Sequence, residues 1–126
     1  MKTLTKAEEQ IMQILWNLKE GVVKDVVERF EEPRPAYTTV ATVLKVLENK
    51  EFVSCRKIGN TNLFSPAISK KEYARNRFSL FLQDYFGGSF PKLATFFAKE
   101  NNLSMEELEE MMRITEKELK KDNEKE

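Results

Sequence analysis

The 126-residue chain contains no histidine, a single cysteine and four glycines, and each scarcity excludes a class of function. Without histidine the usual metal sites cannot be assembled, and the commonest general acid–base group is missing. The lone Cys55 rules out an intramolecular disulfide. The sequence also has no glycine-rich phosphate loop. We therefore expect a protein that is not an enzyme and that needs no metal or cofactor.

Long hydrophobic runs are missing as well. No apolar stretch approaches the length of about 20 residues that a membrane-spanning helix needs. The opening sequence MKTLTKAEEQ has no signal-peptide hydrophobic region. We expect no membrane insertion and a cytoplasmic location. With 33% charged and 40% hydrophobic residues, the composition is typical of a soluble protein with one good core.

An excess of either charge is absent, since 21 basic residues balance 21 acidic ones. A purely electrostatic nucleic-acid binder would carry a large positive excess, so the neutral total argues against that class. The charge is unevenly distributed, however. Residues 34–64 hold five basic and two acidic side chains, and much of the balancing acid lies in residues 100–126. A local basic patch is therefore compatible with the neutral total.

What the sequence does contain is a series of helix signals. Three capping boxes, Thr5 to Glu8, Ser69 to Glu72 and Ser104 to Glu107, each predict a helix start, because the hydroxyl accepts a backbone N–H and the glutamate reaches back. The first helix is expected to end near Gly21. Its apolar face consists of Ile11, Ile14, Leu15 and Leu18.

A short second helix follows, and the prolines of EEPRP then interrupt it because neither fits a helix interior. A third helix is predicted from about residue 36 to residue 50. Beyond it the apolar period changes to two, which predicts strands over residues 52–58 and 62–65 joined by a tight turn at residues 59–61. The inward-facing residues are Val23, Val26, Val27 and Phe30 in the second helix, and Val40, Val43, Leu44 and Leu47 in the third.

Three helices followed by a β-hairpin form a winged helix-turn-helix, whose third helix enters the DNA major groove. The side of that helix opposite the buried stripe carries Thr38, Ala41, Thr42 and Lys45. Threonine can hydrogen-bond a base edge or pack its methyl on thymine, and lysine can reach phosphate or guanine. The alternative is that the threonines are solvated surface, or that Thr38 and Thr39 cap a frayed start. The basic excess and the wing favour DNA contact.

The strings LTKAEEQIMQILW, VVKDVVERF, PAYTTVATVLKVLENKEFV and RKIGNTNLFSP resemble the penicillinase-repressor (BlaI/MecI/CopY-type) family of bacterial transcriptional regulators. The resemblance is strong over residues 4–66. It implies a mainly α protein with a winged-helix DNA-binding domain over residues 1–68 and a helical dimerisation domain over residues 69–126. It also implies a homodimer that represses by binding an inverted-repeat operator in double-stranded DNA. The expected DNA contacts are Thr38, Thr39, Ala41, Thr42, Lys45, Val46, Arg56, Lys57 and Asn60.

The C-terminal half predicts a dimer without that resemblance. Residues 73–97 hold six of the nine phenylalanines, and two short helices of one chain have little to bury these rings against. The last helix adds apolar residues at near-heptad spacing, with Glu109–Arg113 and Glu116–Lys120 as expected ion pairs on its exposed face. A monomeric helical cap on the winged helix is the alternative. The expected dimer residues are Phe78, Phe81, Leu82, Tyr85, Phe86, Leu93, Phe96, Phe97, Leu108, Met112 and Leu119.

The resemblance also implies how repression is relieved. Copper-responsive members carry a cysteine-rich C-terminal motif that RITEKELKKDNEKE lacks, so we do not expect copper sensing. In antibiotic-responsive members a membrane sensor initiates proteolysis in the dimerisation region. The corresponding stretch is KLATFFAKENNLS, where Phe96-Phe97 aligns with the cleaved Asn-Phe pair of some relatives. Winged helices also serve as protein-interaction modules, and the neutral net charge keeps that alternative open.

Overall fold

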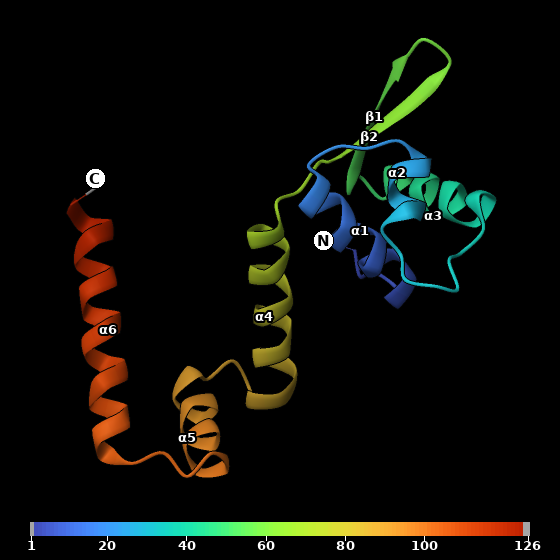
Figure 1. Cartoon of the computed structure of the whole chain (residues 1–126). Coiled ribbons are helices and arrows are strands. Elements are labelled where there is room, and N and C mark those ends of the chain that lie inside the picture. Colours follow the sequence, from blue (N-terminus) through green and yellow to red (C-terminus); the bar gives the residue numbers. More distant parts are fainter. Residues whose placement is uncertain (1, 125–126) are drawn as a thin grey trace. The chain divides into compact units, whose positions relative to one another are not determined.

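The computed structural model describes residues 2–124, and these form six helices and one β-hairpin (Figure 1). By their contacts these residues divide into two units, with the division between Phe78 and Ser79. The elements are α1 (Lys6–Leu18), α2 (Val23–Glu28), α3 (Tyr37–Asn49), β1 (Val53–Ile58), β2 (Thr61–Pro66), α4 (Lys70–Phe86), α5 (Phe90–Glu100) and α6 (Met105–Glu124). The mainly helical winged-helix architecture expected from the sequence is confirmed.

The wing is a two-stranded antiparallel hairpin that projects from the three helices of the first unit (Figure 1). Its pairs run from Val53 opposite Pro66 to Ile58 opposite Thr61. Because Thr61 pairs with Ile58, the connecting turn is one residue shorter than predicted. Gly59 in that turn has a φ of +63°, a left-handed conformation that favours glycine.

Gly21 has a different role from the expected helix cap. The first helix already ends at Leu18, where Lys19 takes a φ of 72° as the capping residue. Gly21 instead exchanges two backbone hydrogen bonds with Phe64 of β2, at 2.9 and 2.8 Å. This short bridge ties the base of the wing to the segment between α1 and α2.

The core of the first unit is built from the predicted apolar stripes. Val40, Leu44 and Leu47 of α3 are almost fully buried. Ile11 and Leu15 of α1 are buried with them, whereas Ile14 and Leu18 lie at the edge of the core. Met12 is fully buried although it lies outside the predicted stripe. The remaining members of the core are Leu4, Val23, Val26, Phe52, Val53, Phe64 and Tyr73.

The first turns of α4 belong to this core. Tyr73 is buried against the rings of Trp16 and Phe52, with centroid separations of 5.6 and 6.0 Å. Its hydroxyl donates to Glu9 Oε2 at 3.1 Å, and the Trp16 indole N–H donates to the carbonyl of Ile68 at 2.9 Å. The division between the units therefore falls within α4 and not at its start.

The capping serines and threonine occupy the positions that the sequence indicates. Thr5 forms the complete capping box with Glu8. Ser69 and Ser104 accept the backbone N–H groups of Glu72 and Glu107 at 3.0 and 3.1 Å. Two left-handed glycines, Gly87 and Gly88, separate α4 from α5. They are followed by Ser89, a cap that was not predicted and that accepts from the backbone N–H of Lys92 at 3.3 Å.

The second unit comprises the end of α4 with α5 and α6, and no described residue of it is buried. Aromatic contacts link Phe86 to Phe81 and Phe96, with centroids 5.8 and 5.5 Å apart. On α6 the predicted Glu116–Lys120 ion pair is present at 3.4 Å. The predicted Glu109–Arg113 pair is wrong, because Arg113 pairs with Glu110, three residues away, at 2.6 Å. Within residues 2–124 we find no helix with the length and apolar character needed to span a membrane.

Candidate nucleic-acid interface

Helix α3 separates a buried apolar face from an exposed polar face. Its core residues fix the helix in rotation, so the opposite face is presented to solvent. Thr38, Thr42 and Lys45 are exposed there, as predicted, and Thr39 is also exposed on α3. Val46 is 38% exposed. Ala41 differs from these, since it is half-buried and packs against the edge of the core.

Thr42 is held in a defined orientation. Its hydroxyl donates to the backbone carbonyl of Thr38 at 2.9 Å. Because this bond occupies the hydroxyl hydrogen, the oxygen lone pairs are left to accept from a base edge. The helix itself begins at Tyr37 with Ala36 as the capping residue, and no side chain caps it. The alternative that Thr38 and Thr39 cap the helix start is therefore wrong.

The wing presents polar and basic side chains beside this helix. Arg56, Lys57 and Asn60, the wing residues expected to contact DNA, are all exposed on the hairpin. Arg56 lies 3.6 Å from a carboxylate oxygen of Glu20, which follows α1. Cys55 is half-buried against the core, as expected for a small hydrophobic residue.

Lys45 is engaged by a neighbour on its own helix. Its ammonium group lies 3.0 Å from Oε1 of Glu48, one turn further along α3. The hydrogen bond to Glu48, together with the negative charge of that carboxylate, raises the pKa of Lys45. Lys45 therefore stays fully cationic, and it is exposed enough to exchange this partner for another anion.

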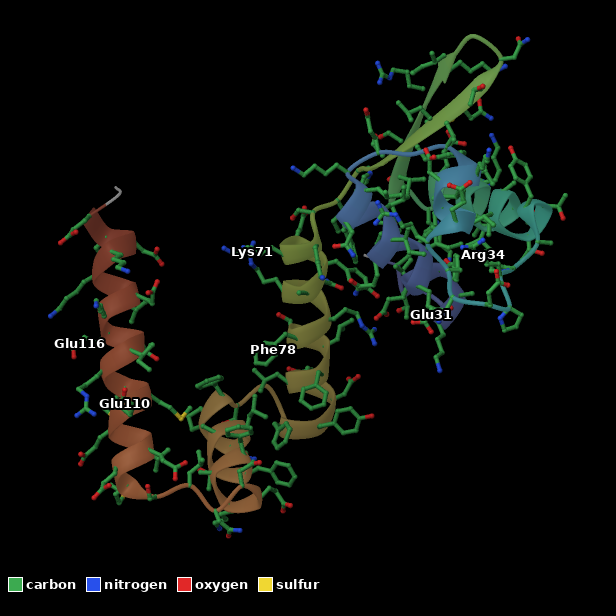
Figure 2. All side chains as sticks on the ribbon, in the orientation of Figure 1. Glu31, Arg34, Lys71, Phe78, Glu110 and Glu116 are labelled. Atoms are coloured by element: carbon green, nitrogen blue, oxygen red, sulfur yellow. The ribbon has the colours of Figure 1, made fainter. Side chains whose placement is uncertain are left out.

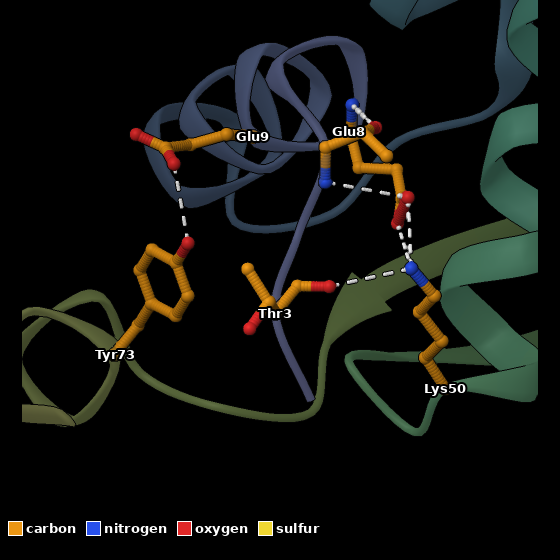
Figure 3. A network of polar contacts seen from close by, with 6 residues as sticks. Thr3, Glu8, Glu9, Lys50 and Tyr73 are labelled. Atoms are coloured by element: carbon orange, nitrogen blue, oxygen red, sulfur yellow. Dashed lines mark hydrogen bonds and ion pairs between the residues drawn. The ribbon is translucent and has the colours of Figure 1, made fainter. Parts of the chain in front are cut away.

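Lys50 is not available to DNA, although it contributes to the basic excess of residues 34–64. It lies at the C-terminal end of α3, and its ammonium group donates to both carboxylate oxygens of Glu8 at 2.9 and 2.8 Å (Figure 3). A third contact at 3.4 Å reaches the carbonyl of Thr3. No sequence pattern indicated this pairing, because Glu8 and Lys50 are 42 residues apart. Lys50 instead fastens the end of α3 to the start of α1.

The Glu8 carboxylate is a buried charge with its partners in place. Burial raises its pKa, but hydrogen bonds from Lys50 and Thr5 outweigh that effect and leave the pKa below its ordinary value. The charged form of Glu8 is thus favoured in the folded protein. The Glu8–Lys50 pair supports the rotation and tilt with which α3 presents its polar face.

Most of the expected dimer residues are exposed in the single chain. Tyr85 and Met112 have 73% and 70% of their surface exposed. Phe78, labelled in Figure 2, is exposed on α4, and polar side chains such as Glu110 and Glu116 project from α6. Exposed members of the predicted set are Phe78, Phe81, Tyr85, Phe96, Phe97, Met112 and Leu119, and half-buried members are Leu82, Phe86, Leu93 and Leu108.

A three-helix unit with a β-wing, whose third helix exposes a threonine-rich face beside basic wing residues, defines a winged-helix DNA-binding regulator. The sequence profile of the penicillinase repressor family matches residues 4–117. The chain belongs to this family, which consists of transcriptional repressors and not of enzymes. The family predicted from the sequence is thereby confirmed.

Two relatives in sequence each match about nine tenths of the chain. The penicillinase repressor of Staphylococcus aureus is 26% identical over 112 residues, which are 88% of this chain and 89% of the relative. The methicillin resistance regulatory protein MecI of Mammaliicoccus sciuri is 23% identical over 115 residues, covering 90% of this chain and 94% of the relative. A solved structure of the CopR repressor is 28% identical, covers 54% of this chain and all of its own, and has a TM-score of 0.45.

Proposed function

We propose that this protein is a homodimeric repressor that reads an inverted-repeat operator with helix α3 of each protomer. The observation that carries the proposal is the exposed face of Thr38, Thr42 and Lys45 on a helix whose other face is locked into the core. A rigid helix with short polar side chains can approach base edges closely in the major groove. The repressor family of the chain supports the same role.

The wing and the start of α3 supply contacts to the DNA backbone. Arg56, Lys57 and Asn60 stand on the exposed hairpin, where they reach phosphates beside the groove that α3 enters. The first turn of α3 has no side-chain cap, so its backbone N–H groups are left for a phosphate oxygen. These contacts position the protein, while Thr38, Thr42 and Lys45 specify the sequence.

The apolar surface of the second unit supports a dimer. Six aromatic side chains of α4 and α5 are exposed in the single chain, and α6 exposes further methionine and leucine side chains. Apolar surface on this scale is a mark of association between chains. A twofold dimer places two α3 helices about one DNA turn, roughly 34 Å, or a multiple of it apart, which matches an inverted repeat.

Repression is relieved, in this proposal, when a membrane sensor triggers proteolysis and destroys the dimer. The stretch that corresponds to the cleaved region of relatives includes Phe96 and Phe97, which are both about half exposed within α5. Cutting α5 would separate the apolar residues of one protomer and so lower operator affinity. Full-length protein that persists after induction, with target transcription raised, would contradict this step.

The DNA-reading role is tested by fluorescence anisotropy with the duplex upstream of the protein's own gene and a scrambled duplex, each at two salt concentrations. Thr42→Ala should lose about 1–3 kcal/mol of discrimination between the two duplexes, or roughly 5- to 150-fold. Thr95→Ala is the matched control, because the Thr95 hydroxyl makes the same bond to a carbonyl four residues back, on α5. The native complex should contain two chains per duplex.

Equal and weak binding to both duplexes would remove this promoter as the target. It would also favour the second class of function for this fold, a winged helix that binds another protein. Specific binding that Thr42→Ala leaves unchanged would instead show that a different surface reads the operator.

A further inference from the structure

Two of the three basic side chains on the proposed DNA-reading surface, which comprises the exposed face of α3 and the wing, are paired with carboxylates of the same chain. Lys45 of α3 contacts Glu48 at 3.0 Å, and Arg56 of the wing contacts Glu20 at 3.6 Å. Both cationic side chains remain about 70% exposed. Among the residues that the structure describes, Lys57 is the basic side chain of this surface without an ion pair.

The two acidic residues come from separate parts of the sequence. Glu48 lies on α3 itself, while Glu20 follows α1 and reaches the wing across 36 positions of the chain. The three basic side chains of the surface therefore face two carboxylates, which leaves a local excess of one positive charge per protomer. That excess is small for a protein whose contacts to phosphate depend on positive charge.

We propose that Glu20 and Glu48 compete with DNA phosphate for Arg56 and Lys45, and so weaken sequence-independent binding. This inference rests on the proposed DNA-reading function. To contact a phosphate, each cation leaves its carboxylate, and the released carboxylate then lies near the negatively charged backbone. Binding to arbitrary DNA depends almost wholly on such phosphate contacts, so it bears this cost without compensation from base contacts.

The exchange also changes the response to salt. A phosphate contact normally releases a counterion from DNA, which makes the logarithm of the binding constant fall with the logarithm of salt by about 0.9 per contact. A carboxylate released from its lysine or arginine takes up a cation in return. Fewer ions are then released in total, and the dependence on salt is shallower than the number of phosphate contacts implies.

The test compares full-length wild type, Glu48→Gln, Glu20→Gln and the double variant, using anisotropy titrations of a scrambled duplex across a range of salt concentrations. Each substitution keeps the side-chain shape and removes the competing charge. Exposed ion pairs are individually weak, and a dimer carries each pair twice, so we expect a single substitution to raise affinity for scrambled DNA by about two- to thirtyfold. The salt slope should steepen by up to about 0.9 for each pair removed.

Glu116→Gln is the matched control, because it changes the net charge equally and removes the exposed Glu116–Lys120 pair of α6. It should leave affinity and slope unchanged. Variants of Glu20 and Glu48 that behave like wild type would overturn the proposal, as would an equal gain from Glu116→Gln. Because the scrambled duplex contains no operator, this test does not depend on operator recognition. A wild type that shows no preference for the operator would refute the proposed function, whereas the effects of Glu20 and Glu48 on scrambled DNA would still decide this proposal.

Discussion

The ion pair between Glu8 and Lys50 offers a direct test of how α3 is held. Lys50→Met removes the ammonium group that donates to both oxygens of Glu8 at 2.9 and 2.8 Å, and it keeps most of the aliphatic stem. The Glu8 side chain is only 7% exposed, so its carboxylate would remain buried without its main partner. Removing one member of a buried pair costs about 3–5 kcal/mol.

The expected cost here is lower, because the Lys50 side chain is 24% exposed and water can approach the vacated position. We expect a loss of about 2–3 kcal/mol in the free energy of unfolding. For a unit of this size that corresponds to a fall in Tm of roughly 8–24 °C. Urea unfolding followed by circular dichroism measures the loss, and Lys57→Met, at an exposed wing position, serves as the control.

The pH dependence gives an independent readout of the same pair. The folded-state pKa of Glu8 lies below its ordinary value of 4.5. Folding therefore favours the charged form of this carboxyl group over its protonated form. The stability from this pair is complete above pH 4.5 and is lost as pH falls through the lowered pKa. In Lys50→Met the hydrogen bonds from Thr5 remain but those from the lysine are lost, so the pKa of Glu8 rises relative to wild type. Acid should therefore narrow the difference in unfolding free energy between Lys50→Met and wild type. A loss in the free energy of unfolding below about 0.5 kcal/mol at neutral pH would refute this reasoning. A difference in stability between Lys50→Met and wild type that grows in acid would refute it as well.

Two further variants test the core of the first unit and the surface of the second. Leu44→Ala should lower the free energy of unfolding in urea by about 2–5 kcal/mol, because Leu44 is fully buried. Val46→Ala on the exposed side of α3 should lower it by less than about 1 kcal/mol. Similar losses in the two variants would mean that α3 does not bury the face that carries Leu44. The double variant Phe81→Asp/Phe97→Asp should halve the mass found by light scattering, because it places charges in the apolar surface that we propose lies between protomers. Gln13→Asp on α1 should leave the mass unchanged. An unchanged mass in the double variant would show that these rings lie outside the dimer interface.

The local elements could be predicted from the sequence because they depend on neighbours in the chain. The capping box at Thr5 joins groups three residues apart, and the apolar spacing of Val40, Leu44 and Leu47 defines a face of a helix by itself. The exposed positions of Thr38, Thr42 and Lys45 follow from that spacing, since they lie on the opposite side. Fold class, family and the candidate reading helix were therefore accessible from sequence patterns alone.

The tertiary structure decided which charges and backbone groups meet across long sequence separations. Lys50 was counted with the basic patch, yet it is bound to Glu8, and Arg56 reaches Glu20 from the wing. Gly21 pairs with Phe64 and does not cap α1, and Tyr73 joins the start of α4 to the core of the first unit. None of these pairs has a signature in local sequence, because a hydrogen bond or ion pair depends on three-dimensional distance and not on spacing along the chain. The sequence thus determined the helices and the exposed face of α3 that we propose reads DNA, while only the folded chain determined how much unpaired positive charge lies on that face and the wing.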